Sequence, residues 1–192
     1  MDRQVQNIFL EKKNIQMIKL QDYIHCYENA LDLDVCKKII NNSITTNFNK
    51  ANVTFGDSEH RKCYTQKLDF KFDKNLFTAV GKVIKKYSED HKNFSTGLTI
   101  EDTGYEHLIY IGQQGGEYKE HTDHGDLTPR VLTCSFILND DYDGGEFVFF
   151  GNTYKIPPKA GSAVVFPSNF CFPHAVTPVT NGNRHAVITW IH

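Results

Sequence analysis

Residues 132–149 read LTCSFILNDDYDGGEFVF, and this stretch decides the fold. Two apolar runs with high strand propensity flank a polar segment that ends in Gly144-Gly145, a strong turn signal. Short strands and turns of this kind fill nearly all of the chain after Gly97. Such repetition is typical of two antiparallel sheets packed face to face. The sequence therefore predicts a mainly β protein of the α+β class, with a double-stranded β-helix (a jelly-roll, cupin-like fold) as its core.

Two helices are expected before this β-rich region. Asp32 or Asp34 can cap a helix that runs to about Asn42. Asp73 is expected to cap a second helix that runs to about Tyr87. Both helices have apolar residues at helical spacing, and these residues are Leu31, Val35, Cys36, Ile39 and Ile40 in the first and Leu76, Phe77, Val80, Val83, Ile84 and Tyr87 in the second.

The remaining organisation is simple. We predict a single domain over 1–192, with helical support over about 29–92 and the jelly-roll core over about 98–192. A first strand is expected around 15–20. Residues 43–66 are polar and are predicted to be irregular, either as a solvated loop or as a lid that carries specificity. Within that segment, Arg61 is the residue of most interest.

His121-Thr122-Asp123, followed by His174, is the pattern with the most chemical content. Two imidazoles and one carboxylate are what a non-haem iron(II) site needs on one face of the metal. Residues i and i+2 of a strand point the same way, so an unbroken strand places His121 and Asp123 on one face. A second triplet, His124-Gly125-Asp126, follows at once. Because its glycine favours a turn, we interpret it as a solvated strand end.

His174 and Arg184 each have two interpretations. His174 is either a metal ligand on an exposed rim strand or a buried histidine satisfied by a backbone hydrogen bond. Arg184 shares a strand face with Ala186, Ile188 and Trp190. An arginine among apolar side chains is costly unless an anion binds it. The anion is either an aspartate of the chain or the far carboxylate of a dicarboxylic co-substrate, which a planar guanidinium can bind bidentately.

The segment from about Gly104 to His192 resembles the catalytic core of the prolyl 4-hydroxylase-type Fe(II)/2-oxoglutarate oxygenases. The resemblance rests on motifs in the family's order and covers nearly half of the chain. These motifs are Tyr110-Ile111-Gly112-Gln113, Tyr118, His121 with Asp123, Arg130–Thr133, Leu138-Asn139-Asp140, Gly144–Phe147, Lys159–Pro167, His174, Val176, Pro178, Val179, Gly182 and Arg184. The chain departs from the family at Arg184, where many prolyl hydroxylases have lysine, and at Ile137, where some relatives have tyrosine.

The resemblance implies a set of cofactors and roles. Fe(II) would be held by His121, Asp123 and His174, and 2-oxoglutarate by Arg184 and Tyr110. O2 would be the oxidant, with ascorbate as a further candidate. Thr133 and Trp190 are interpreted as walls of the pocket, and no side chain is needed as a general base.

The implied reaction is hydroxylation of an aliphatic carbon, with release of succinate and CO2. A prolyl residue of a peptide or protein substrate is the leading candidate for the hydroxylated group. One alternative is the same chemistry on a free amino acid or another small molecule. The alternative from a different class is a non-catalytic jelly-roll binding module.

Composition narrows the partners. The formal net charge is −2 and there is no basic block, so a nucleic-acid partner has no electrostatic support. No apolar run reaches membrane length, and residues 1–4 lack the character of a signal peptide, so no membrane partner is expected. The five cysteines have no paired metal spacing and are expected to be buried thiols in a reducing compartment. A cytoplasmic protein is therefore predicted.

Overall fold

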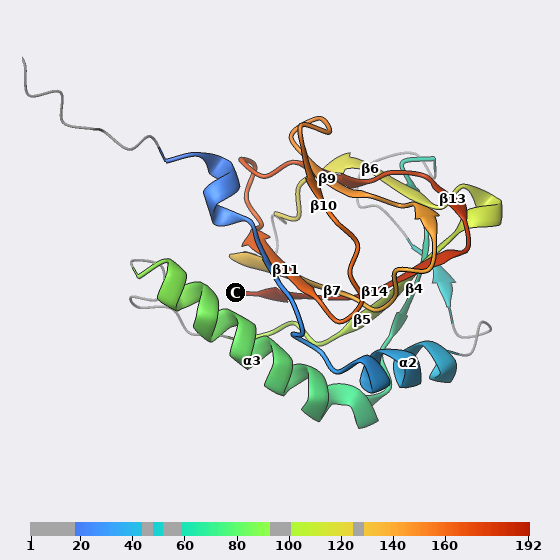
Figure 1. Ribbon diagram of the computed structural model, residues 1–192, viewed down its shortest axis with the longest axis horizontal. Coiled ribbons are helices and arrows are strands. Elements are labelled where there is room, and N and C mark those ends of the chain that lie inside the picture. The colour runs from blue at the N-terminus through green and yellow to red at the C-terminus, as the bar shows by residue number, and fades with distance from the viewer. Residues whose placement is uncertain (1–17, 44–47, 52–58, 93–100, 125–128) are drawn as a thin grey trace, which may run out of the picture.

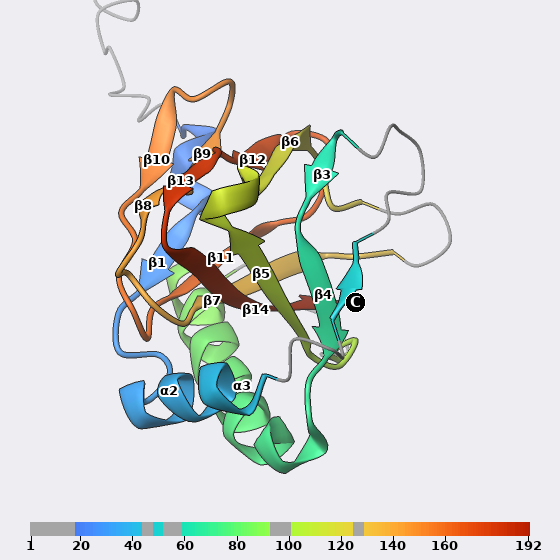
Figure 2. The same cartoon turned by 90° about the vertical axis from the view of Figure 1, so that its right-hand side faces the viewer.

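The computed structural model describes residues 18–43, 48–51, 59–92, 101–124 and 129–192. In these residues, two antiparallel sheets pack face to face, and two α-helices lie along the outer side of the larger sheet (Figures 1 and 2). The prediction of a mainly β protein with supporting helices is confirmed.

The larger sheet has seven strands and the smaller one has five. In spatial order, the larger sheet contains β1 (His25–Tyr27), β11 (Ala163–Pro167), β7 (Leu132–Ile137), β14 (Asn183–Ile191), β5 (Glu106–Ile111), β4 (Tyr64–Lys67) and β2 (Asn49–Lys50). The smaller sheet contains β10 (Tyr154–Ile156), β9 (Phe147–Phe149), β12 (His174–Val176), β6 (Glu117–His121) and β3 (Arg61–Lys62). A two-stranded ladder joins β8 (Asp143–Gly144) to β13 (Val179–Asn181), which leads into β14.

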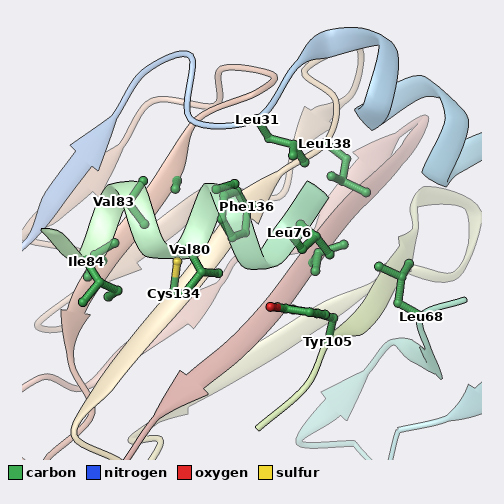
Figure 3. Packing of buried hydrophobic residues seen from close by; sticks show 14 of the residues in the cluster. Leu31, Leu68, Leu76, Val80, Val83, Ile84, Tyr105, Cys134, Phe136 and Leu138 are labelled. Atoms are coloured by element: carbon green, nitrogen blue, oxygen red, sulfur yellow. The ribbon is translucent and has the colours of Figure 1, made fainter. Parts of the chain in front are cut away.

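The larger sheet is covered on both faces, which explains why all six residues of β7 are buried. Side chains of a strand alternate between faces. Cys134 and Phe136 accordingly pack with the helices, while Ile137 packs between the two sheets. Figure 3 shows the first of these clusters, with side chains of α3 beside Cys134 and Phe136. The opposite, inner face is left for the cavity between the sheets.

The first helix, α2 (Leu33–Asn42), begins as the sequence predicts. Asp32 is its N-cap, and its carboxylate accepts a hydrogen bond of 2.7 Å from the backbone N–H of Asp34. Cys36 and Ile39 are its buried residues. The predicted choice between two caps is thus settled in favour of Asp32.

The second helix, α3 (Asp73–Asp90), differs from the prediction in two respects. The 3-10 helix η3 (Phe70–Phe72) runs directly into it, so Phe72 occupies the N-cap position and Asp73 is the first helical residue. No side chain of the described residues caps α3; the carboxylate of Asp69 instead caps η3, where it accepts a hydrogen bond from the backbone N–H of Lys71. Phe77 was expected in the buried stripe but is 70% exposed, because it lies at the edge of the face centred on the other apolar positions.

Two further predictions on the N-terminal half are wrong where the structure describes them. Of the strand expected over 15–20, residues 15–17 lie outside the described residues, and Leu20 begins the 3-10 helix η1 (Leu20–Tyr23). The segment 43–66 is not simply irregular: residues 44–47 and 52–58 are outside the described part, but the rest contributes β2, β3 and the start of β4. These strands are short, polar and near sheet edges, so they lack the apolar alternation by which strands are identified.

Among the helices that the structure describes, none has the length and apolarity needed to cross a membrane.

Candidate metal centre

Two histidines face each other across a pair of strands. His121 is the last residue of β6 and His174 is the first residue of β12, and the antiparallel register pairs the two directly. Side chains directly opposite one another on such a pair lie close together, and the two imidazole centroids are 4.3 Å apart. The smaller sheet therefore brings together His121 and His174, which are 53 positions apart in the sequence.

Asp123 completes the group from just beyond the end of β6. Its Oδ1 lies 3.5 Å from Nε2 of His121 and its Oδ2 lies 3.5 Å from Nε2 of His174. One potential ligand atom from each of the three residues lies within 4.8 Å of the others. The competing triplet does not join this group: His124 is exposed, and Asp126 lies outside the described residues.

The two imidazoles use Nδ1 for hydrogen bonds to the backbone, so the Nε2 atoms, which lie beside Asp123, are available to a metal ion. Nδ1 of His121 lies 2.8 Å from the carbonyl oxygen of Lys119, and Nδ1 of His174 lies 3.0 Å from that of Phe172. A neutral imidazole can meet a carbonyl only by donating from Nδ1, so both Nε2 atoms keep their lone pairs. His174 is 3% exposed and bonds to a backbone carbonyl, and its Nε2 is still available to a metal ion. The two interpretations of His174 from the sequence are therefore compatible.

The charge states also suit a cation. Burial would raise the pKa of the Asp123 carboxyl, but His174, His121 and the Thr133 hydroxyl together hold it below its usual range. Burial lowers the pKa of His174 to about 4. A carboxylate anion and a neutral imidazole are the forms that bind a metal ion.

Arg184 lines the same cavity, and none of the described residues gives it an anionic partner. Its side chain is 2% exposed, and no carboxylate among the described residues lies within ion-pair distance of it. Its Nε is buried without a hydrogen-bond partner in the described part of the chain. The guanidinium carbon lies 5.1 Å from the ring centroid of Tyr110 and 5.9 Å from that of Phe147. The alternative of a structural salt bridge from Arg184 to an aspartate is therefore not seen in the part of the chain that the structure describes.

A cavity of about 410 Å³ connects these groups. It lies between the sheets, and the predicted face of β14 lines it with Arg184, Ile188 and Trp190. Tyr110 lies beside Arg184 in the β5–β14 register and also lines the cavity. Burial raises the pKa of the Tyr110 hydroxyl, which stays protonated as a hydrogen-bond donor.

Arg61 lines the cavity from β3, the edge strand of the smaller sheet. Its guanidinium carbon lies 4.7 Å from the ring centroid of Tyr118, whose ring stacks on His121 with centroids 3.4 Å apart. The position of Arg61 thus supports the prediction that it is a site residue. The sequence analysis placed Arg61 on an irregular segment, but it lies on a strand.

The sequence reasoning also missed two contacts to Asp123. Thr133, interpreted as a pocket wall, donates a hydrogen bond of 2.7 Å to Oδ2 of Asp123. Nη1 of Arg130 donates to the backbone carbonyl of Asp123 at 3.1 Å, and this guanidinium stacks 3.6 Å from the ring centroid of Trp190. The motif match at Arg130–Thr133 marked the position of these residues but not their contacts, because those depend on how the two sheets face each other.

Comparisons with known proteins agree with this geometry. The model of the 2OG-Fe(II) oxygenase superfamily matches residues 105–192. A PKHD-type hydroxylase from Colwellia psychrerythraea is 28% identical over 153 residues, which are 75% of this chain and 66% of that protein. The chain thus spans slightly less than two thirds of the length of this relative.

Two solved structures have the same fold. The viral collagen prolyl hydroxylase of Paramecium bursaria Chlorella virus-1, in complex with 2OG, superposes with a TM-score of 0.66 at 19% identity, over 88% of this chain and 95% of that one. A prolyl hydroxylase from Trichoplax adhaerens, in complex with a peptide fragment of the hypoxia inducible factor oxygen degradation domain, gives 0.71 at 17% identity, over 88% and 83%. These likenesses confirm the double-stranded β-helix.

Two histidines and one carboxylate on a jelly roll, with an arginine in the same cavity that has no anionic partner among the described residues, are features typical of the non-haem Fe(II) oxygenases that use 2-oxoglutarate. Both groups fit the residues present: the triad offers N, N and O atoms to iron, and Arg184 offers a buried cation to a carboxylate. Residues 105–192 of the chain are thus similar to the 2OG-Fe(II) oxygenase superfamily, and the chain is similar to a PKHD-type hydroxylase.

Proposed function

We propose that this protein hydroxylates a prolyl residue of a peptide or protein substrate, with Fe(II) and 2-oxoglutarate. His121, Asp123 and His174 hold the iron, and Arg184 and Tyr110 hold the far carboxylate of 2-oxoglutarate. The observation that carries the proposal is the buried guanidinium of Arg184, which has no anionic partner among the described residues and opens on the cavity of the triad. A buried cation of this kind is costly until a carboxylate binds it.

When bound, Fe(II) and 2-oxoglutarate supply the oxidation: one oxygen atom of O2 enters succinate, CO2 is released, and the other oxygen atom enters the substrate C–H bond. The chain's own residues bind, orient and exclude water. The carbonyls of Lys119 and Phe172 fix the two imidazoles with Nε2 toward the cavity. The apolar side chains of Leu108, Val176 and Ile188 line the cavity and reduce its access to water.

The far end of the cavity supports a prolyl substrate. Arg184 and Trp190 lie on the same face of β14, six residues apart, so they are separated by roughly 20 Å at the usual rise of a strand. A co-substrate bound at Arg184 therefore leaves room near Trp190. The flat indole ring, fixed by the stacked guanidinium of Arg130, offers an apolar surface that suits a five-membered ring.

Succinate formation from 2-oxoglutarate, measured with and without proline-containing peptides, tests the proposal. We expect turnover that requires Fe(II) and rises with peptides, and mass spectrometry should find one added oxygen atom on proline. His174→Ala should abolish turnover, whereas His124→Ala, which removes an exposed histidine next to the site, should retain it. Stimulation by free proline but by no peptide would favour the small-molecule alternative. Absence of iron-dependent turnover with any substrate would favour the binding module.

A further inference from the structure

Asp123 differs from the two histidines in how its backbone is held. His121 and His174 are paired partners in the β6–β12 ladder, so sheet hydrogen bonds fix their positions. Asp123 lies two residues beyond the end of β6 and belongs to no strand. The carboxylate at the centre of the site therefore needs other contacts to fix its orientation.

The Thr133 hydroxyl makes such a contact from the opposite sheet. Thr133 is fully buried on β7, and its Oγ1 lies 2.7 Å from Oδ2 of Asp123. An ionised carboxylate only accepts hydrogen bonds, so the Thr133 hydroxyl must be the donor. Hydrogen bonds to an ionised group are shorter and stronger than those between neutral groups. The other carboxylate oxygen, Oδ1, lies 3.5 Å from Nε2 of His121.

Ser168 fixes the direction of the hydroxyl in turn. Its Oγ lies 2.9 Å from Oγ1 of Thr133, and the residue is almost fully buried just after β11. Because the single proton of Thr133 goes to Asp123, Ser168 must donate to Thr133. The Ser168 backbone is itself anchored, since its N–H donates to the carbonyl of Val131 at 3.1 Å. The order Ser168 to Thr133 to Asp123 is therefore the one arrangement that satisfies all three groups.

We propose that Thr133, supported by Ser168, is a positioning residue for the metal centre. It holds Oδ2 of Asp123, and it thereby fixes the orientation in which Oδ1 faces Nε2 of His121 and Oδ2 faces Nε2 of His174. This relay links the larger sheet to the carboxylate of Asp123, which follows β6 of the smaller sheet, and Arg130 donates to the backbone carbonyl of the same aspartate. The inference rests on the proposed role of the triad as the iron site, and it adds the group that sets the geometry of that site.

Metal affinity is the direct test, because it does not depend on turnover. Mn(II) is titrated into the wild type and the variants by calorimetry, and the electron paramagnetic resonance spectrum of the bound ion reports its geometry. Thr133→Val, which keeps the shape of the side chain and removes the hydroxyl, should weaken Mn(II) binding about 10- to 100-fold and change the spectrum. Thr133→Ser restores a hydroxyl and should recover most of the affinity. Ser168→Ala should give a smaller loss in the same direction.

Thr189→Val is the matched control. Thr189 is also fully buried, on the neighbouring strand β14, and its hydroxyl has no hydrogen-bond partner among the described residues. Its variant should bind Mn(II) as the wild type does. Unchanged affinity and spectrum in Thr133→Val, with a wild type that binds Mn(II), would overturn the positioning role and leave the metal site standing. If the wild type binds no Mn(II) and no Fe(II), the proposed function fails as well. If Thr133→Val does not fold, equal affinities of Ser168→Ala and wild type overturn the relay.

Discussion

Arg184→Met should raise the stability of the ligand-free protein and weaken the binding of 2-oxoglutarate. The substitution keeps an unbranched apolar side chain at a position that is 2% exposed and removes a charge without an anionic partner among the described residues. In most proteins, the loss of a buried arginine destabilises the fold. Here the opposite is expected in the absence of ligand, because the guanidinium is desolvated and its Nε has no hydrogen bond within the described chain.

The magnitudes follow from these contacts. Relief of an unsatisfied buried polar group contributes about 1–3 kcal/mol to the free energy of unfolding. For a chain of 192 residues this corresponds to a rise in melting temperature of roughly 2–12 °C. The loss of one partner from a buried hydrogen-bonded charge pair costs about 2–5 kcal/mol, so the Kd for 2-oxoglutarate should rise at least about 30-fold.

Two assays measure the two effects on the same samples. Thermal unfolding of the protein without ligand gives the stability change, and titration of the Mn(II)-loaded protein with 2-oxoglutarate gives the affinity. Arg184→Lys serves as the control, since it keeps a cation and should retain part of the affinity while gaining little stability. A destabilised Arg184→Met protein that binds 2-oxoglutarate as well as the wild type would refute the reasoning, because the guanidinium would then be structural.

Three further outcomes are expected. Burial lowers the pKa of His107 to about 3 and that of His185 to about 4, so the unfolded chain binds more protons than the folded chain below pH 6.5. The free energy of unfolding should therefore fall by about 2 kcal/mol for each histidine between pH 7 and pH 5. Urea unfolding at the two pH values measures this loss, and His107→Phe should make the loss smaller. Gly144→Ala should cost at least about 2 kcal/mol, because φ is +70° and the new Cβ would lie 2.2 Å from a backbone carbonyl oxygen, whereas Gly151→Ala, at φ +61° in open space, should cost only the backbone strain of about 1–2 kcal/mol. Trp190→Leu should raise KM for a prolyl peptide about 10-fold and leave KM for 2-oxoglutarate unchanged, and equal changes in both constants would contradict a separate substrate end of the cavity.

The local parts of the fold could be predicted from the sequence. Asp32 as a cap follows from a side chain that reaches a backbone N–H two residues away, and the β-rich region follows from the alternation and turns after Gly97. What failed depends on tertiary context. Asp73 does not cap α3, because a 3-10 helix runs directly into it. The strands β2, β3 and β4 were not recognised because short strands at or next to a sheet edge can be polar on both faces.

The candidate site divides in the same way. Residue type and spacing were enough to select His121, Asp123, His174 and Arg184, since each is chemically suited to the role that we propose for it. The contact between Thr133 and Asp123 was not predictable, because Thr133 lies on the larger sheet and Asp123 lies just beyond β6 of the smaller sheet, and the two meet only when the sheets pack together.

Binding of 2-oxoglutarate to the protein with and without a divalent metal ion tests the central claim most directly. If the triad and Arg184 serve one cavity, the co-substrate contacts both, and Mn(II) should tighten 2-oxoglutarate binding at least about 10-fold in an anaerobic titration. The reciprocal tightening of Mn(II) by 2-oxoglutarate should have the same size. Equal affinity of 2-oxoglutarate for the metal-free and the metal-loaded protein would contradict a shared site.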